Sequence, residues 1–283
     1  MRRAWPWCLP IRGILSTSFL PLVKVLIERF DLLMAKRFLP YFLLCTSFLI
    51  SGCGTAMLSD EHLARRSKSQ FSKMKAKEPI STNSSHQAMI ERIGKRITKV
   101  ARVDLPGTEW EFVVFQKSEP NAFAMPGGKV GVNSGLIDLA GGNEDEVAAV
   151  IGHEIAHVAC RHSNKRMTQA MGIALGGVIL NTAMRNKSST DRLLATGAYG
   201  AGTTVGMALP FSRSQEQEAD HRGLFYSARA GYDPRAAISF WQKMQSRKKR
   251  YMPQFLSTHP NPGNRIQFLQ SHMNHAYSLY VEA

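Results

Sequence analysis

Two histidines four positions apart restrict the possible fold of this chain more than any other feature. His153 and His157 enclose the sequence His-Glu-Ile-Ala-His, and Glu154 directly follows the first of them. On an α-helix this spacing places both imidazole rings on one face, about one turn apart. Such a pair can bind one zinc ion, and the adjacent glutamate can act as a general base. The motif therefore predicts a helix built around a catalytic zinc site.

The neighbours of the motif favour a metal site over a chance match. An apolar stripe at helical spacing includes the glutamate: Val147, Val150, Ile151, Glu154 and Val158. A carboxylate on such a stripe becomes buried, which is costly unless it is paired or close to a metal. Asn143 and Glu146 form an Asn variant of the capping box, so we expect the helix to run from Glu144 to about Arg161.

A catalytic zinc site needs a third protein ligand and one open position. Metzincins have a histidine ten residues after the first, but that position is Ser163 here. A helix expected over 213–230 instead offers Glu216 and Asp220, which are four residues apart and share one face. Glu216 is our candidate third ligand, and Asp220 can accept a hydrogen bond from a ligand histidine or assist a proton transfer. The alternative role of these acids is to stabilise the helix N-terminus.

Two further polar residues are expected to lie apart from the zinc. His162 would be turned about 140° from His157 if the helix continued, which predicts a structural or surface role. Glu218 lies between Glu216 and Asp220 in the sequence, so we expect its side chain to point away from their shared face.

The remaining sequence predicts an α+β domain over 86–283, mainly helical with a small antiparallel sheet. Residues 110–115 and 129–133 have the composition of strands and flank a Gly-rich turn at 126–128. Further helices are expected at 86–103, 164–185, 190–209, 213–230, 234–247 and 263–273. The stretch 164–209 is rich in Gly and Ala, and its scattered polar residues favour a tightly packed soluble hairpin over membrane insertion.

The amino-terminal region is expected to export the chain. Residues 34–52 combine a short basic segment, an apolar run and small residues, as a secretory signal peptide does. They end in Ile-Ser-Gly before Cys53, which resembles the lipobox of bacterial lipoproteins. That resemblance implies a lipid anchor on the periplasmic side of the bacterial outer membrane. Residues 1–33 are expected to be an over-extended start or a leader, and 53–85 a lipidated tether that can include a short helix.

Charge and cysteine content exclude two other kinds of site. The net charge is +15, but the basic residues are scattered and lack the aromatic interleaving of nucleic-acid binding motifs. We therefore expect no nucleic-acid partner. The four cysteines form no CxxC pair, so a zinc ribbon built on cysteines is excluded.

Three motifs together resemble the M48 (Ste24-like) metallopeptidase family, most closely its bacterial lipoprotein and periplasmic members. In chain order they are Asn121-Ala-Phe-Ala-Met-Pro-Gly-Gly128, His153-Glu-Ile-Ala-His157 and Glu216-x-Glu-Ala-Asp220-x-x-Gly223. The resemblance implies a zincin-like fold with one zinc ion per chain, bound by His153, His157 and Glu216. It also implies that Glu154 is the base and that Asp220 assists catalysis.

The resemblance also concerns substrate handling. It favours an edge strand that binds extended polypeptides through main-chain hydrogen bonds, with ordinary sheet structure as the alternative. The expected strand comprises Asn121, Ala122, Phe123 and Ala124. Residues 258–266 match a late motif of the family. In it His259 is expected to regulate the site or contact the substrate, against a plain loop-packing role, and Arg265 to pair with an acidic neighbour near the site.

We therefore expect a zinc-dependent metalloendopeptidase that hydrolyses misfolded or envelope proteins as quality control. Its partners would be polypeptide substrates and, through the lipid on Cys53, the membrane. The alternative is a zinc-bearing periplasmic chaperone or assembly factor with little proteolysis.

Overall fold

The computed structural model describes residues 58–193, 195–197, 200, 213–248, 255, 258–259 and 264–283. The chain divides into two units, residues 1–53 and residues 54–283, and every described residue belongs to the second. The expected leader at 1–33, the signal peptide at 34–52 and the lipidation site Cys53 therefore lie outside the described residues.

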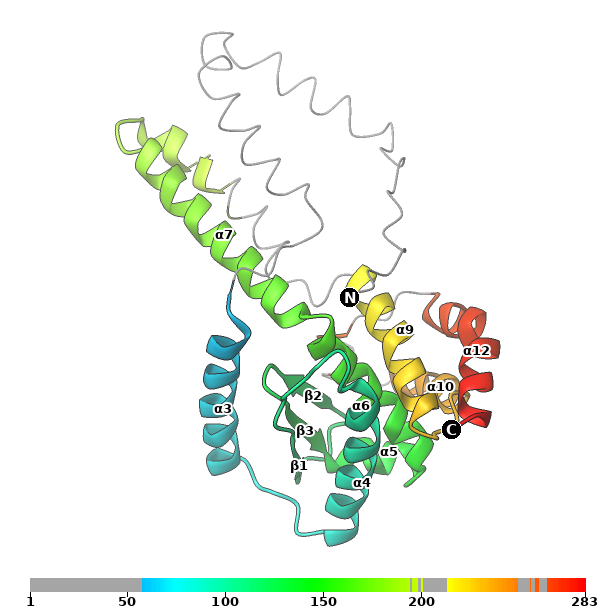
Figure 1. The fold of residues 1–283 in the computed structure, drawn as a ribbon. Helices are drawn as coiled ribbons and strands as arrows, with labels where there is room; N and C mark the ends of the chain where they lie inside the picture. The colour runs from blue at the N-terminus through cyan, green and yellow to red at the C-terminus, as the bar shows by residue number, and fades with distance from the viewer. Residues whose placement is uncertain are drawn as a thin grey trace. The chain divides into compact units, whose positions relative to one another are not determined.

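A three-stranded mixed sheet lies beside the helices (Figure 1). Its strands are β1 (Glu111–Phe115), β2 (Ala122–Met125) and β3 (Lys129–Asn133), in the order β1-β3-β2. β2 runs antiparallel to β3 across a turn in which Gly127 and Gly128 have φ of 79° and 80°, values that favour glycine. β1 pairs with the other edge of β3 in parallel, so the expectation of a purely antiparallel sheet is wrong. The turn joins β2 directly to β3, which gives β2 the antiparallel position.

The helices agree with most of the sequence expectations, and the mainly helical α+β class is confirmed. In chain order the described helices are α3 (Asp60–Lys77), α4 (Ser84–Ala101), α5 (Ser134–Ala140), α6 (Glu144–Ala159), α7 (His162–Ala183), α9 (Arg213–Arg229), α10 (Ala236–Lys248) and α12 (Arg265–Val281). α12 is longer than the expected 263–273, and α5 is not among the expected helices. The helix expected at 190–209 lies partly outside the described residues.

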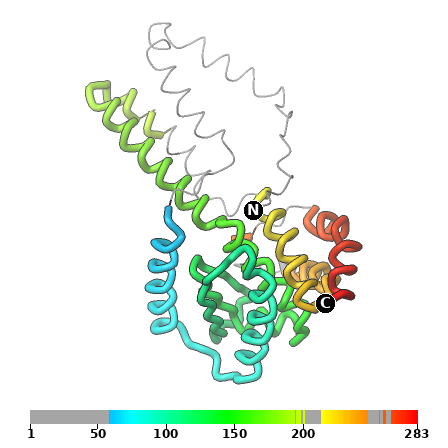
Figure 2. The backbone as a smooth tube through the Cα atoms, viewed as in Figure 1, coloured from blue at the N-terminus to red at the C-terminus, as the bar shows by residue number. Residues whose placement is uncertain are grey.

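Helix α6 is the centre of the hydrophobic core. Its side chains at Val147, Ile151 and Ile155 are fully removed from solvent. α4 contributes Ile90, Ile93 and Ile97 to the same cluster. Burying each of these side chains stabilises the fold by about 1.5–3 kcal/mol, so the helix with the metal motif is firmly held. α9 packs along α6, as the tube in Figure 2 shows.

Residues 60–77 form helix α3 and belong to the folded domain rather than to an extended tether. Phe71 is 1% exposed and packs edge-on against Phe115 and near Phe123 of the sheet. The composition indicates at most a short helix here, because Leu63 and Phe71 are the only large apolar residues that α3 buries.

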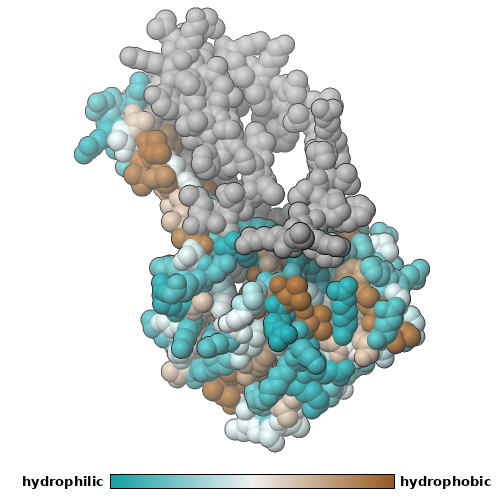
Figure 3. Space-filling model, in the orientation of Figure 1, coloured by the Kyte–Doolittle hydropathy of each residue, from teal (hydrophilic) through white to brown (hydrophobic). Residues whose placement is uncertain are grey.

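Helix α7 is held to the domain mainly by its first turn, where His162 and Asn164 are buried. Figure 3 shows apolar side chains gathered along this helix. The exposed ones are Met167, Met171, Leu175, Val178 and Ile179. Among the described residues, no helix has both the length and the apolar character needed to span a bilayer.

Candidate metal centre

Helix α6 carries His153, Glu154 and His157 into the interior, where their exposed fractions are 4%, 2% and 2%. The helix begins where the sequence predicts. The Asn143 side chain accepts hydrogen bonds from two main-chain N–H groups of the first turn, which stabilises that end. The motif is therefore fixed on a capped helix inside the core.

Two glycines let α9 approach α6 at main-chain distance. A Cβ atom built on Gly223 would lie 2.6 Å from the main-chain N of His153, and one on Gly152 would lie 2.8 Å from the main-chain O of Gly223. Both separations are too short for real side chains, so a larger residue would force the helices apart. The close crossing brings Glu216 and Asp220 of α9, both buried, beside the histidines of α6.

Four buried side chains direct nitrogen or oxygen atoms at one another: His153, His157, Glu216 and His259. His153 Nε2 lies 3.0 Å from His157 Nε2 and 3.3 Å from His259 Nδ1. Glu216 Oε1 lies 3.1 Å from His259 Nδ1 and 3.4 Å from His157 Nε2. Four ligands bound tetrahedrally at about 2.0–2.1 Å from zinc would be about 3.3–3.4 Å apart. The donor set and its spacing thus fit one metal ion of that kind.

The electrostatics of this cluster favour a cation. Burial and nearby Arg265 oppose a positive charge on His153, but hydrogen bonds to Asp220 and Glu216 outweigh them and raise its pKa to about 9. Burial alone would raise the pKa of Glu216, yet hydrogen bonds with three histidines hold it far below its usual range. The carboxylate therefore stays charged in the interior and is stabilised by positive charge beside it.

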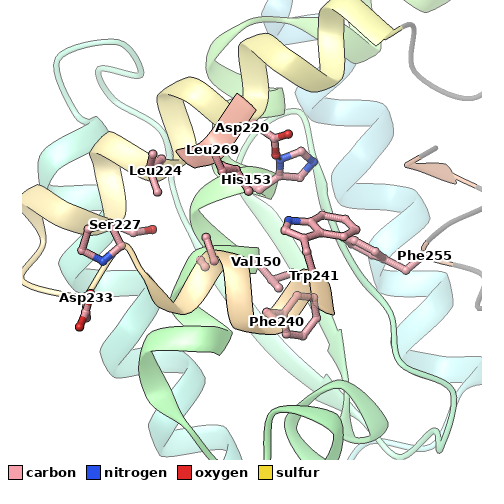
Figure 4. Close-up of a pocket in the computed structure, with 13 residues that line it drawn as sticks. Val150, His153, Asp220, Leu224, Ser227, Asp233, Phe240, Trp241, Phe255 and Leu269 are labelled. Atoms are coloured by element: carbon pink, nitrogen blue, oxygen red, sulfur yellow. The ribbon is translucent and has the colours of Figure 1, made fainter. Parts of the chain in front are cut away.

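Asp220 and Arg265 hold the donor residues in place. Asp220 Oδ1 lies 3.0 Å from His153 Nδ1 and can accept its N–H, as the sequence predicts. Arg265 donates to Glu216 Oε2 at 3.0 Å and to Asp220, and its guanidinium lies 3.6 Å from the centre of the Trp241 ring. Figure 4 shows His153 and Asp220 next to one another, with the Trp241 indole beside them. The acidic partners of Arg265, which the sequence left open, are thus Glu216 and Asp220.

Glu154 faces the strand that the sequence predicts for substrate binding. The main-chain N–H of Ala124 in β2 donates to Glu154 Oε2 at 3.2 Å, so this edge of β2 points toward the base. Among the described strands β2 pairs with β3 alone. Ala122 and Phe123 belong to the same strand, and Asn121 directly precedes it. Burial raises the pKa of Glu154, which suits a group that takes up a proton near neutral pH.

His259 reaches the cluster from the segment before α12 and is 2% exposed. Besides the contacts of its Nδ1 with His153 and Glu216, its Nε2 lies 3.3 Å from Glu154 Oε1. The structure therefore places this residue inside the site, between the donor atoms and the candidate base, rather than in a loop that packs elsewhere.

Two residues that border the cluster were not predicted. His162 Nδ1 lies 2.9 Å from His157 Nδ1, and His162 Nε2 lies 3.1 Å from Glu218 Oε2. His162 is buried against a donor residue, so a surface position is wrong, because that expectation continued α6 as a regular helix. Glu218 meets His162 rather than the face of α9 that carries Glu216 and Asp220. α6 ends at Ala159, and Arg161 has φ of 56°, which turns the chain back. No local pattern marks this turn, because a left-handed residue after a helix is usually Gly or Asn.

A comparison with protein families identifies the group to which this arrangement belongs. Residues 84–273 match the model of Peptidase family M48, and that stretch contains all four donor residues. The chain belongs to peptidase family M48.

Relatives of two kinds are similar to this M48 chain. The mitochondrial metalloendopeptidase OMA1 of Schizosaccharomyces pombe is 32% identical over 183 residues, which are 64% of this chain and 51% of the relative. The beta-barrel assembly-enhancing protease of Escherichia coli K12 is 32% identical over 203 residues, which are 69% of this chain and 40% of the relative. The chain thus spans about half the length of the curated relatives it matches.

Proposed function

We propose that this M48 chain is a zinc-dependent endopeptidase that hydrolyses unfolded or misassembled polypeptides. The observation that carries the proposal is the convergence of two histidines of α6 and a glutamate of α9 on one point, with Glu154 close by. We assign His153, His157 and Glu216 as the ligands of one zinc ion. Zinc bound there would polarise the scissile carbonyl and make water more acidic.

The chain's own residues supply positioning and proton transfer. Glu154 takes the proton of the attacking water onto a carboxylate oxygen and passes it to the leaving amine. Burial favours this role because it raises the pKa of that carboxyl group. Asp220 holds the ring of His153 through Nδ1. The edge of β2 that faces the base binds the substrate as an added strand, through main-chain hydrogen bonds that place no demand on its sequence.

Strand addition favours extended, unfolded polypeptides as the substrate class. The Escherichia coli relative is named a beta-barrel assembly-enhancing protease, which supports envelope proteins as targets. The Ile-Ser-Gly-Cys53 sequence supports a lipid anchor on the periplasmic side of the outer membrane. Mass spectrometry of the mature chain tests this anchor, and an unlipidated terminus upstream of Cys53 would contradict it.

Removal of the metal should abolish proteolysis. We expect chelator-treated protein to lose cleavage of unfolded casein, and one equivalent of Zn²⁺ per chain to restore it, because the donor set holds a single ion. Mass spectrometry of the casein products measures cleavage, and elemental analysis measures bound zinc. Full cleavage by the metal-free chain would contradict the proposal.

The alternative function is a zinc-bearing chaperone or assembly factor. The exposed apolar side chains of α7 favour it, since such a surface can hold unfolded polypeptide. In the same assay a chaperone would suppress aggregation of casein while the zinc-loaded protein left the casein uncut.

We further propose that His259 restrains the peptidase by occupying the space that water and the scissile carbonyl need. Its Nδ1 lies beside the donor atoms of His153 and Glu216, and its Nε2 lies beside Glu154. Replacing His259 by Ala should raise the rate of casein cleavage while bound zinc stays constant, because three protein ligands suffice for a catalytic site. His272→Ala, in the partly exposed surface of α12, is the matched control. A parallel fall in zinc content would instead make His259 an ordinary ligand.

A further inference from the structure

We infer that His162 and Glu218 form a relay that positions His157 for metal binding. The inference rests on the proposed zinc site, and it concerns two residues that are not ligands themselves. His162 was expected to be a structural or surface residue, yet it contacts the ligand His157 directly, and Glu218 in turn contacts His162.

Three side chains form a line that leads outward from the metal centre. His157 turns Nε2 toward the donor cluster and Nδ1 toward His162, whose Nδ1 lies 2.9 Å away. The planes of these two rings meet at 71°, so the rings pack edge to face rather than stacking. His162 then turns Nε2 toward Glu218, whose Oε2 lies 3.1 Å away.

Metal binding by His157 selects one arrangement of protons along this line. Nε2 of His157 must offer its lone pair to the metal, so the proton of that ring is on Nδ1. That N–H donates to Nδ1 of His162, which therefore carries its own proton on Nε2. The second N–H donates to the carboxylate of Glu218, where the line ends. Each hydrogen bond thus fixes the tautomer that the next one requires.

The relay does for His157 what the contact with Asp220 does for His153, the other histidine of α6. Asp220 accepts directly from His153, whereas His157 reaches a carboxylate of the same helix α9 through an intervening ring. His162 is 0% exposed, so its ring is locked in place by the packing around it.

The turn after α6 has an unusual backbone conformation, which brings His162 next to His157. Arg161 is the one non-glycine residue with positive φ in the described part of the chain. Its side chain donates from Nε to Asp60 of α3 at 2.9 Å, which holds the turn against the rest of the domain. A regular continuation of the helix would instead carry His162 away from His157.

A second metal ion is the competing explanation for this cluster. The ligand atoms of Cys160, His162 and Glu218 lie within 4.8 Å of one another, close enough to bind one ion. The local charges disfavour it. The ammonium of Lys165 lies 3.9 Å from Glu218 and the guanidinium of Arg222 lies 4.0 Å from it, so two cations already compensate the carboxylate.

The test compares two replacements of His162 that have nearly the same shape. Asn keeps an acceptor oxygen close to the place of Nδ1, whereas Leu has none. We expect His162→Leu to weaken zinc binding about 10–100-fold in a chelator competition, and His162→Asn to recover most of that loss. In the cobalt-loaded protein, the visible absorption bands of Co²⁺ should change in the Leu variant and stay close to wild type in the Asn variant, since they report ligand geometry.

Two further variants complete the design. Glu218→Ala breaks the relay at its partly exposed end, so it tests the inference even if His162→Leu does not fold, and it should weaken zinc binding in the same direction. Cys160→Ala should leave zinc affinity unchanged. Unchanged zinc affinity in both His162→Leu and Glu218→Ala would overturn the inference. It would also be overturned if the wild-type chain bound two zinc ions and Cys160→Ala lost one of them. Failure of the wild-type chain to bind zinc would count against the proposed function itself.

Discussion

Replacing Glu154 by Gln should lower the rate of peptide hydrolysis by about 10²–10⁴-fold while zinc remains bound. The amide has the shape of the carboxylate but cannot take up a proton from water. Zinc should stay, because the donor atoms belong to His153, His157 and Glu216. The measurement is the rate of casein cleavage at equal zinc content, with metal analysis of both proteins.

A control on the same helix isolates this effect. Glu144 begins α6, is partly exposed and pairs with Arg92 at the surface. Glu144→Gln should change neither cleavage nor zinc content, because surface ion pairs contribute only about 0–1 kcal/mol. Equal cleavage by wild type and Glu154→Gln would end the mechanism proposed for this site.

Replacing Glu216 by Gln should remove both the metal and the activity. The neutral amide is a poor zinc ligand, so we expect zinc affinity to fall by well over about 100-fold and casein cleavage to disappear. The free energy of unfolding should also fall, by about 3 kcal/mol, because Arg265 is 1% exposed and loses a carboxylate partner. Chelator competition measures the first effect and urea unfolding of the metal-free protein the second.

A double variant separates the two consequences. Glu216→Gln combined with Arg265→Met removes the buried Glu216–Arg265 pair as a whole, while Asp220 keeps His153 as a partner, and should recover part of the lost stability but none of the zinc binding. Zinc retained at wild-type affinity in Glu216→Gln would show that the third ligand lies elsewhere.

The helix of the metal motif and its partner helix could be predicted because the relevant information is local. The four-residue spacing of His153 and His157, and of Glu216 and Asp220, depends only on the period of the α-helix. The cap at Asn143 is likewise a property of a few adjacent residues. The structure brings His153, His157 and Glu216 to one point, with Asp220 beside His153.

The parts that were not predicted depend on contacts between distant segments. His162 meets His157 because the backbone at Arg161 leaves helical geometry, and the sequence does not mark that departure. Helix α3 is ordered by the packing of Phe71 on the sheet, although its composition is that of a polar linker. The parallel pairing of β1 with β3 likewise depends on which edge of β3 the turn leaves available. In each case tertiary structure overrides a local pattern.

Because α6 and α9 touch main chain to main chain at Gly152 and Gly223, the segment between them begins and ends beside the metal centre. Its first residues supply His162 and the helix that follows it supplies Glu216, and none of the four donor residues lies in the part of 163–200 that the structure describes. Lengthening a loop costs only about 0.6 kcal/mol for each doubling of its length. Residues inserted in the exposed stretch after α7, at 185–190, should therefore cost little and leave the donor residues in place, so a further binding module could be added there.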